Sequence, residues 1–134
     1  MAVLRDELLG LRAMDDIIKA RQLVRECAVF QGLSLVDQTK VVTAASELAR
    51  NTMIHGGGGE MRLQALNDGP RRGVKVMFVD KGPGIPDIAL AMKDGYTTRG
   101  GLGLGLSGSK RLVNEFDIES QPGKGTTVTI VRWK

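Results

Sequence analysis

The sequence predicts an α+β fold, a two-layer sandwich in which a mixed, mostly antiparallel sheet carries about three helices on one face. Two long segments with helical periodicity, residues 15–31 and 34–54, come first. Two pairs of strand-like segments follow, each pair is joined by a turn, and a third helical segment precedes the second pair. A chain of 134 residues can bury one core, so we expect a single domain over residues 1–134.

The first segments are expected to form a strand and a helix. Residues 8–14 alternate weakly between apolar and polar side chains and predict a strand. Asp15 or Asp16 is expected to cap a helix that continues to about residue 31 with a broad apolar face. The single cysteine, Cys27, falls on this face and is expected to be a buried, unreactive thiol in a reducing compartment.

A second helix is predicted directly afterwards. Ser34, followed three residues later by Asp37, resembles a capping box, in which a short side chain accepts a hydrogen bond from the first turn. The apolar periodicity then continues to about Ile54. The segment "HGGGG", residues 55–59, ends this helix and is expected to be a loop.

A hairpin and a long loop are predicted next. Residues 60–66 alternate, residues 67–73 ("NDGPRRG") are expected to turn, and residues 74–80 return as a more buried strand. The glycine- and proline-rich residues 81–101 form a loop with one possible short helix at 87–93. Loops of this length inside a compact domain are usually lids or binding loops.

The last part of the chain repeats the helix and hairpin pattern. A helix is predicted from about residue 103 to 115. Residues 117–121 and 126–133 are expected to be strands joined by the turn "PGKG" at residues 122–125. The order of elements therefore gives neighbouring strands that are mostly antiparallel.

Composition and charge narrow the possible partners. The net charge of +4 favours an anionic ligand or an acidic protein partner. Only 4% of residues are aromatic, and no cluster of lysine and arginine alternates with stacking side chains, so nucleic acid is not the expected partner. No apolar run approaches the roughly 20 residues that span a bilayer, and the N-terminal residues lack the order of a signal peptide. We therefore expect a cytoplasmic protein without a membrane segment.

The segment "DKGPGIP", residues 80–86, places Asp80 at the end of the buried strand. An exposed carboxylate before a turn often does no more than form the turn. Alternatively, Asp80 accepts an N–H group of a ligand such as adenine, and Gly82 and Gly84 let the backbone approach a flat ring. The motif alone leaves both interpretations open.

Glycines crowd the segment "GGLGLGLSGSKRLV", residues 100–113, before the predicted third helix. Gly100, Gly101, Gly103 and Gly105 would present backbone N–H groups to an anion at the positive end of a helix. The spacing matches neither a Walker P-loop nor a tight Rossmann turn. Phosphate binding is favoured over the alternatives, which are a flexible loop or close packing of the helix.

The segment "AASELARNTMIHG" places Glu47 and Asn51 four residues apart, on one face of the second helix. A solvated pair on the outer edge of the helix is one interpretation. In the other, the carbonyl oxygen of Asn51 binds Mg²⁺ that is already held by phosphates, and Glu47 acts as a general base.

These motifs occur in a fixed order: E-x-x-x-N on a helix, D-x-G-x-G after a strand, G-x-G-x-G before a helix, and G-T at residues 125–126. The arrangement resembles the Bergerat (HATPase_c) ATP-binding fold of the GHKL superfamily, which includes gyrase, Hsp90-type chaperones, histidine kinases and MutL. The resemblance covers essentially the whole chain and implies ATP and Mg²⁺ as cofactors.

The resemblance also implies a role for each motif. Asn51 would bind Mg²⁺, Asp80 would bind the amino group of adenine, and the glycine segment would hold the phosphates under a lid formed by residues 87–105. Glu47 is the implied catalytic residue. The implied nucleotide-binding residues are Asn51, Asp80, Gly82, Gly84, Gly101, Leu102, Gly103, Leu104, Gly105 and Thr126.

Within the superfamily, the chain looks most like the bacterial anti-sigma factor and serine/threonine protein kinase family, and its stressosome switch kinases in particular. This implies phosphoryl transfer from ATP to serine or threonine of a STAS-domain scaffold or antagonist. It also implies that the kinase binds and activates a PP2C-type phosphatase. The alternative is an ATP-gated binding module of the anti-sigma factor type that needs no catalysis. Arg99, Lys110 and Arg111 either contact phosphate or decorate the surface.

Overall fold

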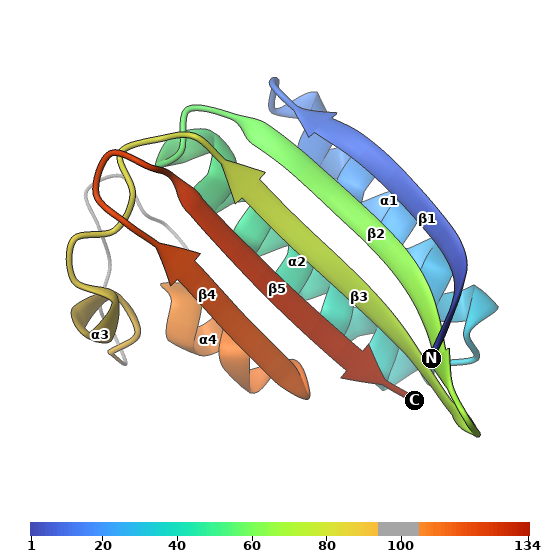
Figure 1. The fold of residues 1–134 in the computed structure, drawn as a ribbon. Coiled ribbons are helices and arrows are strands. Elements are labelled where there is room, and N and C mark those ends of the chain that lie inside the picture. The colour runs from blue at the N-terminus through green and yellow to red at the C-terminus, as the bar shows by residue number, and fades with distance from the viewer. Residues whose placement is uncertain (94–104) are drawn as a thin grey trace.

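The computed structural model describes residues 1–93 and 105–134, which form five strands and four helices (Figure 1). In chain order these elements are β1 (Ala2–Leu11), α1 (Asp15–Phe30), α2 (Leu35–Ile54), β2 (Gly59–Asp68), β3 (Arg71–Asp80), α3 (Ile88–Ala91), α4 (Gly105–Arg111), β4 (Glu115–Ser120) and β5 (Thr126–Trp133). The order predicted from the sequence is confirmed, including the short helix after β3.

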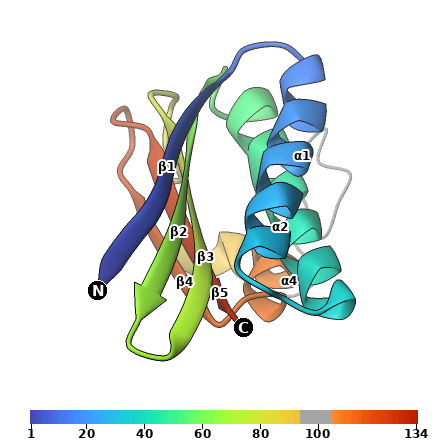
Figure 2. The ribbon, with the colours of Figure 1, turned by 90° about the vertical axis from the view of Figure 1, so that its right-hand side faces the viewer.

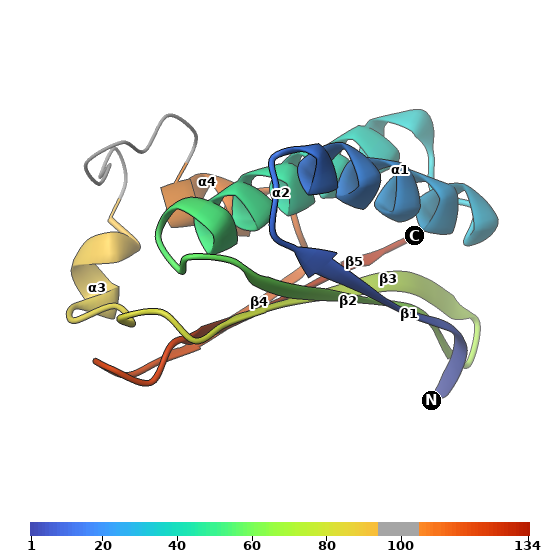
Figure 3. The ribbon, with the colours of Figure 1, turned by 90° about the horizontal axis from the view of Figure 1, so that it is seen from above.

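The strands form one sheet in the order β1-β2-β3-β5-β4, and every neighbouring pair within the described residues is antiparallel. Figures 2 and 3 show that α1, α2 and α4 cover one face of this sheet. The predicted two-layer α+β sandwich is confirmed. Figure 3 also shows α3 at the end of the sheet where α2 finishes.

Alternation along the strands places the apolar side chains under the helices. In β3, Val74, Val76 and Phe78 are buried, while Met77 and Val79 between and beyond them are more exposed. The buried side chains pack against the apolar faces of α1 and α2 in one core cluster. Removing this apolar surface from water is the main driving force for the fold.

Cys27 lies in this core with no exposed surface. Burial raises the pKa of its thiol to about 11, since the surroundings disfavour the thiolate. The thiol is therefore protonated at neutral pH, which agrees with the buried, unreactive cysteine expected from the sequence.

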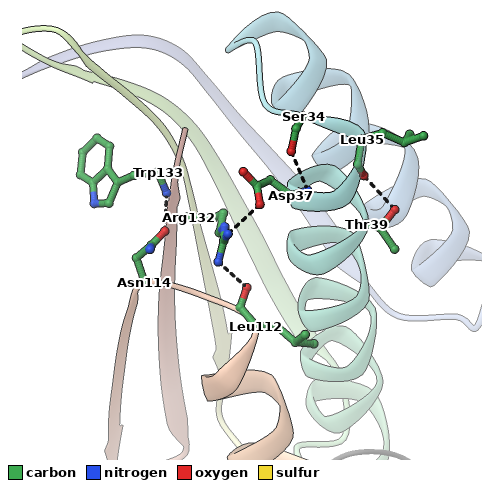
Figure 4. Close-up of polar contacts among 8 residues, drawn as sticks. All are labelled: Ser34, Leu35, Asp37, Thr39, Leu112, Asn114, Arg132 and Trp133. Carbon is green, nitrogen blue, oxygen red and sulfur yellow. Dashed lines mark hydrogen bonds and ion pairs between the residues drawn. The ribbon is translucent and has the colours of Figure 1, made fainter.

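The first turn of α2 is held by a capping hydrogen bond to Ser34 and by a contact of Asp37 with β5 (Figure 4). Ser34 Oγ accepts the backbone N–H of Asp37 at 3.1 Å, as the capping motif predicts. The Asp37 carboxylate forms an ion pair with Arg132 of β5, with Nη2 and Oδ1 2.7 Å apart. Arg132 Nη1 also lies 3.5 Å from the carbonyl oxygen of Leu112, just after α4. One arginine thus connects the sheet to two helices.

Some strands begin or end at other residues than predicted, because pairing with a neighbouring strand sets their boundaries. β1 begins at Ala2 rather than at residue 8, because it pairs with β2 along its whole length, from Asn67 to Gly59. Most of this edge strand is exposed, so its sequence shows only a weak alternation of apolar and polar residues. The β2–β3 turn is shorter than predicted, since Asp68 already pairs with Arg71.

Two helix ends also differ. Met14 occupies the N-cap of α1 and makes no side-chain hydrogen bond to the helix. Asp16 instead accepts the N–H groups of Arg12 and Ala13, at 2.8 and 3.0 Å, and these hydrogen bonds lower the pKa of its carboxyl. α4 ends at Arg111 rather than near residue 115, where β4 begins. No helix of residues 1–93 and 105–134 is long and apolar enough to cross a membrane.

Candidate functional site

A cavity of about 310 Å³ lies at the end of the sheet where α2 and β3 finish. Its walls come from α2, β3, the segment that leads into α3, the start of α4 and the start of β5. A volume of this size is in the range of small-molecule sites. Apolar side chains make up much of the wall, among them Ile54, Phe78, Ile85 and Val128.

α2 contributes Glu47 and Asn51 to the cavity. They lie on one helical face, as the four-residue spacing predicts, and both are partly buried. Ala45, Leu48 and Ala49 beside them are buried in the core. The structure therefore places the pair at the cavity and not on the solvated outer edge of the helix.

The glycine-rich segment after α2 turns the chain toward the end of β3. Gly57 and Gly58 have φ angles of +73° and +102°, which side chains with a Cβ rarely adopt. The segment packs Gly56 against the carboxyl group of Asp80, and a Cβ at Gly56 would lie 2.6 Å from Asp80 Oδ2. From the sequence this segment is expected only to be a loop, whereas in the structure its Gly56 also packs against the carboxyl group of Asp80.

Asp80 is the last residue of β3 and pairs with Gly59 on one side and Thr126 on the other. Its Oδ1 accepts the backbone N–H of Gly82 at 2.9 Å, so the carboxylate forms the turn. The same side chain also lines the cavity. The two interpretations of the sequence motif are therefore compatible, because one carboxylate oxygen makes the turn and Oδ2 makes no hydrogen bond within the described residues.

Thr126 is held by a hydroxyl network that includes Ser120 of β4. Ser120 Oγ accepts the N–H of Ile85 at 2.8 Å and lies 3.1 Å from the carbonyl oxygen of Gly125 and 2.7 Å from Thr126 Oγ1. A serine hydroxyl has one proton to donate. If Ser120 donates it to the Gly125 carbonyl, Thr126 must donate to Ser120 and keeps its lone pairs for a ligand.

Gly82 and Gly84 are required by close backbone contacts within the protein. A Cβ at Gly82 would lie 2.7 Å from the Cα of Gly56. Gly84 has a φ angle of +77°, and a Cβ there would collide with the backbone oxygen of Gln121. Gly84 lines the cavity, but Gly82 is not among the lining residues. These contacts explain both glycines without a ligand.

The predicted phosphate segment is described only at its end. Gly101, Leu102, Gly103 and Leu104 lie outside the described residues, as does Arg99. Gly105 begins α4 with a φ angle of +69° and lines the cavity. The cations that follow it on α4, Lys110 and Arg111, are exposed and are not among the lining residues.

Sequence reasoning missed Arg50, which also lines the cavity. It lies between Glu47 and Asn51 on α2, and its Nε is buried without a hydrogen-bond partner among the described residues. The sequence contained one indication that Arg50 lies near the site: it follows Glu47 by three residues, and such residues are neighbours on a helix.

The donor set of the cavity fits a metal that is shared with a ligand. The described residues contain no group of three or more histidine, cysteine, aspartate or glutamate side chains that would hold a metal ion. A single amide oxygen such as that of Asn51 suits Mg²⁺, which commonly keeps several waters and binds substrate phosphates.

Residues 36–134 match the family model described as histidine kinase-, DNA gyrase B-, and HSP90-like ATPase. The chain is 46% identical over 118 residues to the serine/threonine-protein kinase RsbT of Bacillus subtilis (strain 168), covering 88% of this chain and 89% of RsbT. It is 32% identical over 120 residues to the anti-sigma F factor of Thermoanaerobacter sp. (strain X514), covering 85% of this chain and 82% of that protein.

Two solved structures have a similar fold. The RsbU and RsbW domains of Rv1364c from Mycobacterium tuberculosis superpose with a TM-score of 0.66 at 22% identity, covering 97% of this chain and 33% of that chain. The histidine kinase domain of the blue-light activated histidine kinase EL346 from Erythrobacter litoralis gives a TM-score of 0.57 at 17% identity, covering 92% of this chain and 60% of that chain. At these identities the likeness shows the fold alone.

Proposed function

The chain belongs to the histidine kinase-, DNA gyrase B- and HSP90-like ATPase family, and from this premise we propose that it is an ATP-dependent protein serine/threonine kinase with one kinase domain over residues 1–134. The observation that carries the proposal is that Glu47, Asn51, Asp80 and Thr126 line one cavity. They come from three separate elements of a chain that is 46% identical to a serine/threonine-protein kinase.

Asp80 and Thr126 support binding of adenine at the sheet. They are direct partners in the register of β3 and β5, so their side chains can reach the same ligand edge. The Asp80 carboxylate accepts hydrogen bonds only, which suits the amino group of adenine. Phe78, Ile85 and Val128 give this part of the cavity apolar walls for a flat ring.

Asn51 and the glycine segment support binding of the phosphates. The Asn51 side chain would hold Mg²⁺, and when bound this ion supplies positive charge at the transferring phosphate. The backbone N–H groups of Gly101, Leu102, Gly103, Leu104 and Gly105 would bind phosphate oxygens.

Glu47 would orient or deprotonate the acceptor hydroxyl. It lies one helical turn before Asn51, so a hydroxyl next to its carboxylate is also close to the proposed site of the phosphates. Positioning and charge stabilisation account for most of catalysis in phosphoryl transfer, so the partner protein contributes by placing its serine or threonine.

The proposed substrate is a serine or threonine of a STAS-domain scaffold or antagonist in bacterial stress signalling, and the released kinase would bind and activate a PP2C-type phosphatase. The 46% identity to the serine/threonine-protein kinase RsbT, together with the motif resemblance seen in the sequence, supports this proposal. A phosphorylation cycle of this kind draws on cytoplasmic ATP, so the proposal places the protein in the cytoplasm.

The test of the kinase is incubation of the full chain with Mg-ATP and STAS-domain proteins encoded near its gene, followed by mass spectrometry of each partner. We expect a phosphate on one serine or threonine of a partner. Without Mg²⁺, and with a partner in which that residue is alanine, no transfer is expected. A stable complex with a STAS-domain protein, without phosphate transfer, would contradict the proposed kinase activity.

The likeness to anti-sigma F factors favours a second candidate function. The protein would then be an ATP-gated binding module, in which the nucleotide raises affinity for a sigma factor or a phosphatase without catalysis. Complex formation that depends on ATP and occurs without transfer selects this alternative.

Asp80→Asn is expected to weaken ATP binding, because the amide that replaces one carboxylate oxygen presents N–H groups to the adenine amino group. A mismatched buried polar group costs roughly 1–3 kcal/mol, about 5- to 150-fold in affinity. GTP, which has a carbonyl where adenine has its amino group, is expected to compete weakly with ATP on the wild-type protein. Competition binding with a fluorescent ATP analogue measures both effects, and equal competition by GTP and ATP would contradict this role of Asp80.

A further inference from the structure

Arg50 is a permanent cation in the cavity wall. Among the described residues that line the cavity, it is the only lysine or arginine. Three carboxylates from the described part of the chain line this cavity, those of Glu47, Asp80 and Asp87. The negative charges of these carboxylates repel the phosphates of a nucleotide, whereas Arg50 attracts them.

One nitrogen of the Arg50 guanidinium also lacks a partner within the described residues. This nitrogen, Nε, is buried and makes no hydrogen bond there, although the residue as a whole is only partly buried. Arg132 offers the comparison, since its Nε is also buried without a partner, but its Nη2 forms an ion pair with Asp37 at 2.7 Å. Burying the Nε donor without an acceptor costs free energy, and an anion that enters the cavity would supply an acceptor for the guanidinium.

We infer that Arg50 binds the phosphate chain of the nucleotide, an inference that rests on the proposed ATP-binding function. Arg50 and Asn51 are adjacent on α2, so the helix wall of the cavity would take the phosphates while Asp80 and Thr126 of the sheet take the base. The planar guanidinium presents several donors in a fixed fork that matches two phosphate oxygens. The role is nucleotide binding, separate from that of Glu47 toward the acceptor hydroxyl.

The experiment measures the affinities of ATP and adenosine for the wild-type chain, Arg50→Gln and Arg50→Lys by calorimetry. In Arg50→Gln we expect ATP to bind about 10- to 100-fold more weakly, because hydrogen bonds to a charged group are lost. Adenosine, which has no phosphate, is expected to bind equally to all three. Arg50→Lys keeps the charge without the fork and is expected to recover part of the ATP affinity.

The matched control is Arg72→Gln. Arg72 is exposed near the start of β3, at the opposite end of the strand from Asp80, and its loss changes the net charge by the same amount. ATP affinity is expected to stay at the wild-type value in this variant.

The inference is overturned if ATP binds Arg50→Gln within about twofold of the wild-type affinity, a difference of less than 0.5 kcal/mol. It is also overturned if adenosine loses as much affinity as ATP, because Arg50 would then support the fold of the cavity. If Arg50→Gln does not fold, the same comparison of ATP with adenosine is made on Arg50→Lys. Failure of the proposed function is a separate result, since the wild-type chain would then bind neither ligand.

Discussion

Glu47→Gln is expected to lower the single-turnover rate of phosphorylation by about 10²–10⁴-fold, the usual contribution of a general base. Glutamine keeps the size of the side chain but cannot accept the proton of the acceptor hydroxyl. Because this interaction acts mainly in the transition state, affinities for Mg-ATP and for the partner protein should stay near their wild-type values. If the transition state is loose, less proton abstraction is needed, and the decrease in rate is expected to be about 10²-fold, the lower limit of this range.

The measurement uses saturating Mg-ATP and saturating partner, so that only the transfer step is observed. Glu26→Gln is a suitable control, because Glu26 is an exposed glutamate of α1 outside the cavity lining. A rate for Glu47→Gln within about twofold of wild type, far below the general-base range, would remove Glu47 from the catalytic residues.

Asn51→Ala is expected to abolish the part of ATP affinity that depends on Mg²⁺. In the wild-type chain Mg²⁺ should tighten ATP binding, whereas in the variant the affinities with Mg²⁺ and with a chelator should be the same. Transfer should fall by about 100-fold or more, since a metal ion contributes several kcal/mol of charge stabilisation. Equilibrium titration of a fluorescent ATP analogue at increasing Mg²⁺ gives the first quantity.

Circular dichroism supplies the folding control for Asn51→Ala, and Gln22→Ala on α1 is the control for loss of an exposed amide. The two α2 variants should lose different properties: Glu47→Gln loses the rate of transfer, whereas Asn51→Ala first loses nucleotide binding. A folded Asn51→Ala protein that still binds ATP more tightly with Mg²⁺ would rule out Asn51 as the ligand.

The positions that sequence predicted well depend on local spacing. Glu47 and Asn51 could be placed on one face because a helix repeats every 3.6 residues. Asp80 could be placed at the end of a strand because a buried apolar run stops there and a glycine- and proline-rich turn follows. The capping hydrogen bond of Ser34 is equally local, and the structure contains it.

The positions that sequence reasoning missed depend on contacts between distant segments. Gly56 meets the Asp80 carboxyl group only because β2 pairs with β3 after the glycine turn. The whole length of β1 follows from its pairing with β2, and Asp37 turns toward Arg132 because β5 passes beside α2. No spacing within one segment reveals that Arg50 Nε is buried without a hydrogen-bond partner among the described residues, because the packing of other segments against α2 decides this.

The two halves of α2 serve different purposes, and this division bears on how such a protein can evolve. Its first turn is fixed by Ser34 and by the ion pair of Asp37 with Arg132, which is mostly shielded from solvent and therefore little weakened by salt. Its last turns carry Glu47 and Asn51. Under the roles proposed for Glu47 and Asn51, substitutions at the cavity end would convert a catalytic protein into one that only binds its partner, while the contacts that anchor the helix stay unchanged.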